Sequence, residues 1–315
     1  PPDTGKSSLV RLLVNYCVRE GGEPLLVDLD VGKGSLLVPG SVGAVPVTAP
    51  IRDVGQSSSF PDMGPLAYFY GSRDAAAFPA HLEAIVEDLA VRLEARAASN
   101  PGSREADSGL LIDTFPHKTP KEYSLLLTFV RLLKVDTVVV MDIDKLYSDL
   151  QRDLANQGVK VVKLPKSGGV VSVSQDRQYR KQADRVLVSE YLYGKSRELC
   201  PRHVIVPFDK LHLFRTAPAA LAPRDALPIG QGEPVGRGRP EVKRVEPEET
   251  LENRILAVAG REVGDEQGLA SVNVAGFVHV QKVDTAQARV TFLAPNGLPM
   301  PTSKFLVGDI DFVES

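Results

Sequence analysis

The sequence predicts an α/β fold in which a parallel sheet is covered by helices on both faces, followed by a small α+β unit. Two observations lead to this prediction. Short, nearly continuous apolar runs alternate with longer segments of helical periodicity, as is typical of parallel strands buried on both faces. The sequence Gly-Lys-Ser-Ser also stands directly before the first helical segment, where a loop joins a strand to a helix in such folds.

The predicted elements of the larger unit alternate along the chain. The helices are expected at 7–19, 79–97, 120–134 and 144–156, and the strands at 24–30, 109–114, 135–142, 159–164 and 203–208. In this architecture the strand that leads into the Gly-Lys-Ser-Ser loop is central in the sheet. We therefore expect that strand to precede residue 1 and to be missing from this sequence.

The chain is expected to divide into three parts. Residues 1–215 form the larger unit, residues 216–247 form a linker rich in Pro, Gly, Ala and Arg, and residues 248–315 form the small unit. Within the small unit we predict a helix at 251–258, strands at 271–280, 288–293 and 305–312, and a turn at Asn296-Gly297.

Composition narrows the classes of protein. A net charge of −3 argues against a generally basic nucleic-acid binder, although it leaves a local basic channel open. No apolar run approaches the length of a membrane span, so no membrane partner is expected. The two cysteines, Cys17 and Cys200, are too few for a disulfide framework and fit a reducing compartment.

The N-terminal residues match the end of a Walker A phosphate-binding loop, whose opening glycine would stand one position before Pro1. Backbone N–H groups of such a loop bind a polyphosphate at the positive end of a helix. Lys6 would reach the β- and γ-phosphates of a nucleotide, and the Ser7 hydroxyl would bind Mg²⁺. The alternative is a solvated turn that caps a helix. The candidate nucleotide-binding residues are Asp3, Thr4, Gly5, Lys6, Ser7 and Ser8.

Carboxylates end two of the predicted strands. Asp28 and Asp30 follow the first apolar run, at the sheet edge that faces the ligand crevice, where a carboxylate can accept a proton or hold a metal-bound water. Asp113 ends the run Leu-Leu-Ile and resembles a Walker B aspartate that binds Mg²⁺ through water. The alternative for each is an acidic residue that merely stabilises a turn.

The segment 176–185 is basic and has a helical pattern. Arginines in it would close over bound phosphates as a lid and neutralise charge in a transition state. A solvated helix face would have the same composition.

Taken together, these stretches resemble the Clp polynucleotide 5′-hydroxyl-kinase family, whose nuclear members are subunits of the pre-mRNA cleavage and polyadenylation machinery. Val-Asp-Leu-Asp-Val-Gly at 27–32 and Leu-Pro-Lys-Ser-Gly-Gly-Val-Val at 164–171 are the most specific of the matching stretches. The others, in the order of the family, are 3–9, 35–40, 65–71, 190–194, 226–230 and 274–278.

The resemblance implies an N-terminal β-domain that is missing here, a kinase domain and a small C-terminal domain. It also implies that Lys6 and Ser7 bind ATP and Mg²⁺, that Asp30 is the general base, and that Arg180 and Arg185 are the lid arginines. The expected partners are a scaffold subunit of the cleavage factor and possible RNA, and the expected location is the nucleus.

The sequence departs from the active members of the family at two places. Lys33 stands where they typically have glutamine, and a cation there would alter the electrostatics of the site. The stretch Thr-Phe-Pro-His at 114–117 replaces the one that carries their RNA-binding tryptophan, and the sequence contains no tryptophan at all. Losing a base-stacking aromatic side chain costs about 1–3 kcal/mol of binding.

Two main hypotheses follow. In the first, the protein resembles those fungal members that keep ATP but have lost the kinase reaction, and it acts as an ATP-binding structural subunit. In the second, it is an active RNA 5′-hydroxyl kinase with Asp30 as the base. A generic small-molecule kinase or a GTPase is a weaker third reading, because the sequence lacks the Asn-Lys-x-Asp stretch that reads guanine.

Overall fold

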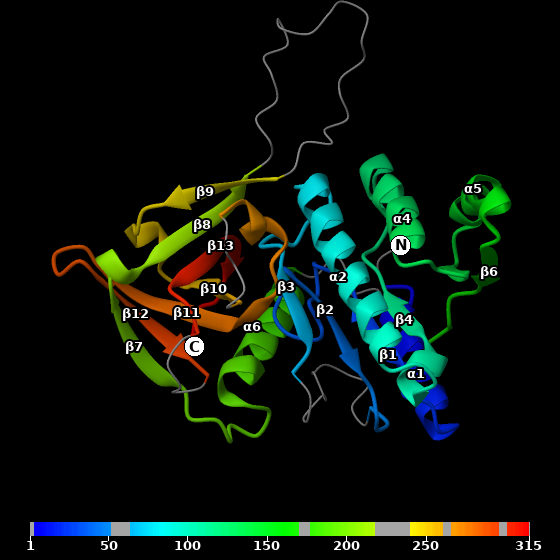
Figure 1. Ribbon diagram of the computed structural model, residues 1–315, viewed down its shortest axis with the longest axis horizontal. Coiled ribbons are helices and arrows are strands. Elements are labelled where there is room, and N and C mark those ends of the chain that lie inside the picture. Colours follow the sequence, from blue (N-terminus) through cyan, green and yellow to red (C-terminus); the bar gives the residue numbers. More distant parts are fainter. Residues whose placement is uncertain are drawn as a thin grey trace, which may run out of the picture.

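The computed structural model describes residues 3–51, 64–169, 177–217, 240–260, 266–295 and 301–314. Two regions lie side by side (Figure 1). One contains small sheets with helices packed around them, and the other is built on a seven-stranded sheet. The predicted α/β class with a second C-terminal unit is confirmed, although the C-terminal unit is mainly β-structure.

The first region contains a four-stranded sheet in the order β3-β2-β1-β4. Its strands are β1 (Leu25–Asp28), β2 (Ser41–Pro46), β3 (Leu66–Phe69) and β4 (Leu110–Asp113). Strands β1 and β4 are parallel, with Asp28 opposite Asp113, whereas β2 and β3 add on in antiparallel fashion. Strands β2 and β3 were not predicted, and because they pair antiparallel this sheet is mixed rather than wholly parallel.

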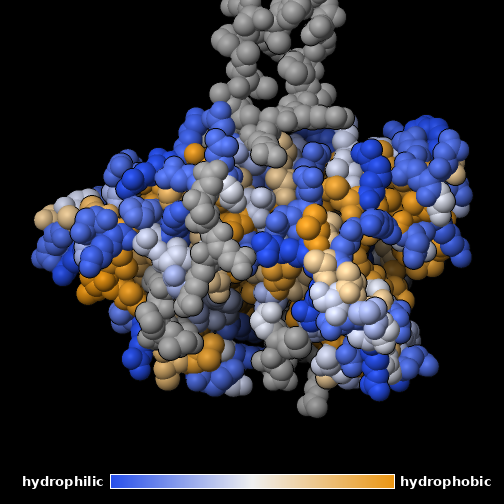
Figure 2. Space-filling model, in the orientation of Figure 1, coloured by the Kyte–Doolittle hydropathy of each residue, from blue (hydrophilic) through white to orange (hydrophobic). Residues whose placement is uncertain are grey.

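Two further parallel strands, β5 (Thr137–Met141) and β6 (Lys160–Leu164), form a separate sheet beyond β4. A cavity of about 430 Å³ lies between β4 and β5 and is lined mainly by apolar side chains of both strands, of α1 and of α4. In Figure 2 apolar residues show through between the positions that α4 and α5 occupy in Figure 1.

The four predicted helices of the first region are confirmed. They are α1 (Lys6–Arg19), α2 (Pro79–Ser99), α4 (Pro120–Leu132) and α5 (Asp144–Leu154), with the short α3 (Arg104–Ser108) and η1 (Ala155–Gln157) beside them. The sequence determines the start of α4 through a capping box. The Thr119 hydroxyl accepts from the Glu122 backbone N–H (3.3 Å), and the Glu122 carboxylate accepts from the Thr119 N–H (2.6 Å).

The basic segment is helical as predicted. Its residues from 177 onward form the first turns of α6 (Arg177–Tyr193). Within the described ranges, none of the helices has the length and apolar composition of a membrane-spanning segment.

The second region is one sheet in the order β7-β12-β11-β10-β13-β8-β9. Short 3₁₀ segments connect its strands at η2 (Phe208–Lys210), η4 (Glu249–Leu251) and η5 (Gln267–Ser271). The strands are β7 (Arg202–Pro207), β8 (His212–Ala217), β9 (Glu241–Val245), β10 (Arg254–Ala259), β11 (Val274–Asp284), β12 (Arg289–Ala294) and β13 (Lys304–Asp311).

In this part of the chain the helix prediction was wrong, and the strand at 203–208 was predicted correctly but expected in the wrong sheet. The helix expected at 251–258 is mostly β10, which pairs with β11 on one side and β13 on the other. The strand expected at 203–208 is β7, which pairs antiparallel with β12 and not with the parallel sheet. Strand β9 lies inside the expected linker 216–247, because it pairs with β8. Most of that linker, the motif at 226–230 and the turn at Asn296-Gly297 lie outside the described residues.

The two regions share one hydrophobic core. Its buried members come from the first region, such as Val14 and Phe69, and from the second, such as Phe277 and Ile310. Hydrogen bonds from main-chain N–H groups cross the same boundary. The Asp309 N–H donates to the Gly71 carbonyl (2.7 Å), and the Phe277 N–H donates to the Tyr191 hydroxyl oxygen (2.9 Å). The regions are therefore packed as one body around a common core.

Candidate nucleotide-binding site

The loop before α1 has the backbone conformation that a phosphate-binding loop requires. Gly5 is the N-cap of α1 and has φ +89°, a left-handed conformation that glycine adopts without steric cost. The Leu9 N–H donates to the Gly5 carbonyl (2.9 Å), which closes the first turn. A glycine at this position supplies no capping side chain, so the first-turn N–H groups point toward whatever lies before the helix.

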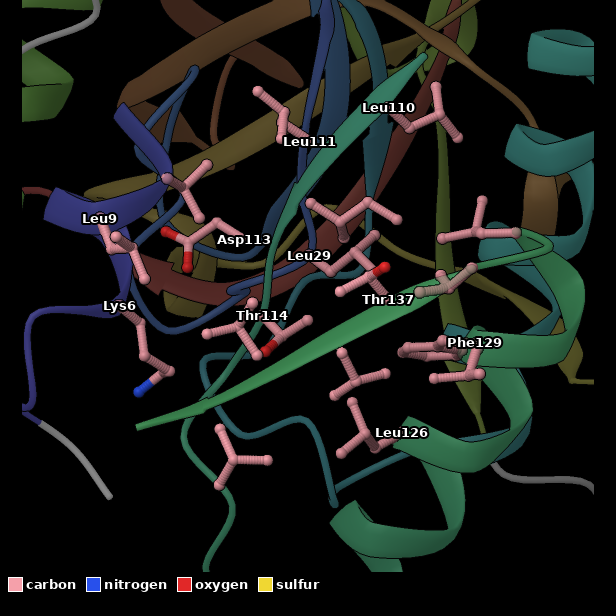
Figure 3. Close-up of a pocket in the computed structure, with 18 of the residues that line it drawn as sticks. Lys6, Leu9, Leu29, Leu110, Leu111, Asp113, Thr114, Leu126, Phe129 and Thr137 are labelled. Atoms are coloured by element: carbon pink, nitrogen blue, oxygen red, sulfur yellow. The ribbon is translucent and has the colours of Figure 1, made fainter. Parts of the chain in front are cut away.

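Lys6 lies in this first turn, and its side chain lines the cavity beside β4. Figure 3 shows it at the same end of the cavity as Asp113, away from Phe129. Burial lowers the pKa of Lys6, and the nearby Lys33 lowers it further, whereas the carboxylates of Asp113, Asp30 and Asp3 act in the opposite direction. A half-buried ammonium in this position is suited to an anionic ligand.

Three carboxylates meet where β1 and β4 end. Asp28 is buried and accepts from the Asp30 N–H (2.9 Å), the Ser35 N–H (2.8 Å) and the Ser35 hydroxyl (2.6 Å). Burial raises the pKa of Asp28 to about 7, and the carboxylates of Asp113 and Asp30 add to this effect. Burial also raises the pKa of Asp30, with Lys33 opposing it. The site therefore concentrates negative charge that a cation or a proton must balance.

Asp113 is 5% exposed, and its Oδ1 has no hydrogen-bond partner among the described residues. Such an orphaned buried oxygen is costly, so it is a place where a cation or an ordered water fits. This half of the predicted Mg²⁺ site therefore suits a metal.

The Ser7 half does not fit a metal in this arrangement. The Lys33 ammonium donates a hydrogen bond to Ser7 Oγ (3.0 Å) and lies 3.8 Å from Asp30 Oδ2. The hydroxyl that would bind Mg²⁺ is thus engaged by a side chain that already carries a positive charge. Across the described ranges, no group of three or more His, Cys, Asp or Glu is arranged to hold a metal ion.

The remaining predicted residues are distributed unevenly. Asp3 has a left-handed backbone (φ +53°) and a buried Oδ2 without a partner in the described part of the chain, Thr4 is buried, and Ser8 is exposed on α1. Arg185 is exposed on α6. The side chain of Arg180 is not among those that the structure describes. The lid assigned to these two arginines stays a prediction.

Sequence reasoning missed the residue that connects α6 to the site region. Arg73 Nη1 forms an ion pair with Asp184 Oδ2 (3.1 Å), and a Cβ added at Gly32 would lie 3.3 Å from the Arg73 carbonyl oxygen. The one indication of Arg73 in the sequence was its position two residues after the stretch 65–71, which matches the family.

The loop before α1, the lysine that follows it and the carboxylates at the strand ends define a P-loop nucleotide-binding fold. Comparison with known protein families shows to which family of P-loop proteins the chain belongs. Residues 1–194 match the family described as mRNA cleavage and polyadenylation factor CLP1 P-loop, and residues 199–314 match Pre-mRNA cleavage complex II protein Clp1. The chain belongs to the Clp1 family, as its resemblance indicated.

Relatives from distant organisms align with the whole chain. A Protein CLP1 homolog from Arabidopsis thaliana is 34% identical over 316 residues, which are 100% of this chain and 69% of the relative. A Polyribonucleotide 5′-hydroxyl-kinase Clp1 from Xenopus tropicalis is 34% identical over 315 residues, 100% of this chain and 70% of the relative.

Solved structures show the same fold. One is the wild-type Clp1p–Pcf11p complex, with a TM-score of 0.79 and 19% identity over 99% of this chain and 73% of that one. Another describes an extended interface between Pcf11p and Clp1p and the basis of ATP loss in a point mutant. Its TM-score is 0.81, with 20% identity over 99% of this chain and 73% of that one.

Proposed function

We propose that this chain is the ATP-binding subunit of a nuclear pre-mRNA 3′-end cleavage and polyadenylation complex, needed for endonucleolytic cleavage before polyadenylation. ATP serves it as a structural ligand, and the chain has little or no RNA kinase activity, like those fungal members of the family that keep ATP but have lost the reaction. Membership of the Clp1 family supports the assignment to this machinery. The left-handed Gly5 and the Lys6 side chain in the cavity support ATP binding.

The contact between Lys33 and Ser7 is the observation that carries the structural role for ATP. An ammonium at the Ser7 hydroxyl and near Asp30 alters the groups that would hold Mg²⁺ and take up a proton. The absence of tryptophan from the sequence adds to this, because no indole is available to stack on an RNA base.

The proposed partner is a scaffold subunit of the cleavage factor, by analogy with the Clp1p–Pcf11p structures. RNA is a second candidate partner, which rests on the resemblance to the family alone. We place the boundary between the nucleotide-binding domain and the C-terminal domain near residue 200. The two family matches change over between residues 194 and 199, and β7 is the first strand of the second sheet.

A phosphate-transfer assay tests this function. The full-length protein is incubated with γ-labelled ATP and a 5′-hydroxyl RNA, beside Lys6→Ala, and its bound nucleotide is extracted and quantified by chromatography. We expect ATP to be retained by the wild type and lost from Lys6→Ala, with no label on the RNA. Label on the RNA that disappears in Lys6→Ala would contradict the structural role.

Asp30 is buried, and burial raises the pKa of its carboxyl group, which suits a base that takes up a proton. This favours a second candidate function, an active RNA 5′-kinase. Asp30 would accept the proton of the RNA 5′-hydroxyl. The hydroxyl oxygen would bond to the γ-phosphorus while the bond between that phosphorus and ADP breaks. Lys6 would hold the γ-phosphate, and Arg180 and Arg185 would close over it. If this reading holds, Asp30→Asn abolishes RNA labelling while ATP binding persists. Labelling that survives in Asp30→Asn would exclude Asp30 as the base.

A further inference from the structure

Lys33 places a positive charge between the two groups that flank the expected metal position. Its ammonium contacts Ser7 Oγ at 3.0 Å and lies 3.8 Å from Asp30 Oδ2. Asp30 is almost entirely buried, whereas the Lys33 side chain is 52% exposed. The ammonium thus reaches the site from the solvent side, where a ligand would enter.

The backbone holds Lys33 in this position. The N–H groups of Lys33 and Gly34 both donate to the Asp30 carbonyl (3.0 and 2.8 Å), so a tight turn folds residue 33 back over residue 30. Gly34 has φ +57°, and a Cβ there would lie 2.0 Å from the Val38 carbonyl oxygen. Any other residue at position 34 would disturb this turn, which means that the location of Lys33 is built into the fold.

The charges around Lys33 explain what it does there. Asp28, Asp30 and Asp113 cluster at the strand ends, and Lys6 is a second cation near Asp30 and Asp113. A divalent ion in such a site balances carboxylates and phosphates together and orders the ligand. An ammonium hydrogen-bonded to Ser7 supplies one positive charge in the same place, and its remaining two N–H donors suit phosphate oxygens.

We propose that the Lys33 ammonium replaces the divalent cation of this site, so that the protein binds ATP without a requirement for Mg²⁺. This inference rests on the proposed nucleotide-binding function and concerns the same pocket. It identifies Lys33 as a residue that determines the metal dependence of nucleotide binding.

Binding of ATP to nucleotide-free, full-length protein, measured by calorimetry in Mg²⁺ and in EDTA, tests the proposal. For the wild type we expect Kd values in the two buffers to agree within about threefold, because Lys33 is the counter-ion in both. For Lys33→Gln we expect ATP to bind at least about tenfold more weakly in EDTA than in Mg²⁺, because Ser7 is then free to bind the metal. Lys282→Gln, which removes an exposed lysine of β11, is the matched control and should behave as wild type.

A second variant assigns the effect to the site. Adding Ser7→Ala to Lys33→Gln should remove the metal dependence that Lys33→Gln creates. A wild type that loses about tenfold or more in affinity in EDTA overturns this inference alone, whether or not the variants fold. Metal-independent binding that persists in Lys33→Gln also overturns it. Failure of the wild type to bind ATP in either buffer overturns the proposed function as well.

Discussion

The two regions of the molecule bury their strands in different ways. In the C-terminal sheet, β10 and β13 each have a hydrogen-bonded neighbour on both sides, and the described strands form one continuous ladder. In the N-terminal region, β4 ends its sheet and faces the cavity of about 430 Å³, with β5 of a separate sheet across it. The same region carries three clustered carboxylates at its strand ends. The site region is therefore the less completely packed of the two, and the C-terminal sheet supports it through the shared core.

Removing the same side chain from each region should show this difference most strongly. Leu256 of β10 is 1% exposed, and truncating it to alanine should cost about 2–5 kcal/mol of unfolding free energy. Leu111 of β4 lines the cavity and is only partly buried, so Leu111→Ala should cost about 1 kcal/mol. Denaturant midpoints of the two variants measure both effects. Equal losses would show that the two regions are equally well packed.

A histidine at the boundary should make the coupling of the regions sensitive to pH. His81 of α2 is buried, and its Nε2 lies 2.7 Å from the Ala270 carbonyl oxygen in η5. Burial lowers the pKa of His81 to about 4, although the Ala270 carbonyl acts in the opposite direction. In the unfolded chain a histidine has a pKa of about 6.5. Between that pH and about 4, the unfolded chain therefore binds more protons than the folded one, and stability is lost as pH falls through that window.

This effect amounts to about 3 kcal/mol if the whole window is crossed. In His81→Gln, which does not titrate, the stability lost between about pH 7.5 and 4.5 should be smaller than in the wild type by roughly that amount. The exposed His203→Gln is the control and should follow the wild type. Parallel pH profiles for wild type and His81→Gln would show that His81 is not the titrating group.

A further effect, smaller than those at Leu256 and His81, is expected at a close approach of the two backbones. A Cβ added at Gly308 would lie 2.5 Å from Gly71 Cα and 2.6 Å from the Gly71 carbonyl oxygen, so the two regions must move apart. Gly308→Ala should destabilise the protein by about 1–3 kcal/mol, measured by denaturant unfolding. Gly268→Ala, with nothing within 4 Å of the added Cβ, should leave stability nearly unchanged. Equal midpoints for both variants would mean that the contact is not tight.

Sequence reasoning located the helices of the N-terminal region because their signals are local. The capping box at Thr119 and Glu122 and the apolar stripe of α2 are readable without knowledge of the partners. Strand β10 was misread because residues 255–259 are apolar without alternation, and such a run is compatible with a helix or with a strand buried on both faces. What decides between them is pairing with β11 and β13, which lie farther along the chain.

The same distinction applies to the site. The motif residues from Asp3 to Ser8 and the carboxylates Asp30 and Asp113 were predicted from short patterns, and the structure brings Lys6, Asp30 and Asp113 into one electrostatic cluster. The sequence marked Lys33 as unusual but could not show its hydrogen bond to Ser7, which depends on the turn at Asp30 and on the placement of α1. The pairing of Arg73 with Asp184 likewise requires tertiary structure.

The shared core also has a consequence for synthesis of the protein on the ribosome. Its residues run from Val14 to Phe312, and β13 is inserted between β10 and β8 near the end of the described chain. Domains generally fold as they emerge, from the N-terminus onward. Here the nucleotide-binding region is translated before the C-terminal sheet, yet the core that the two regions share is not complete until β13 has been translated. Nascent chains should therefore expose part of this shared core until β13 has emerged, and they should be open to chaperone binding during that interval.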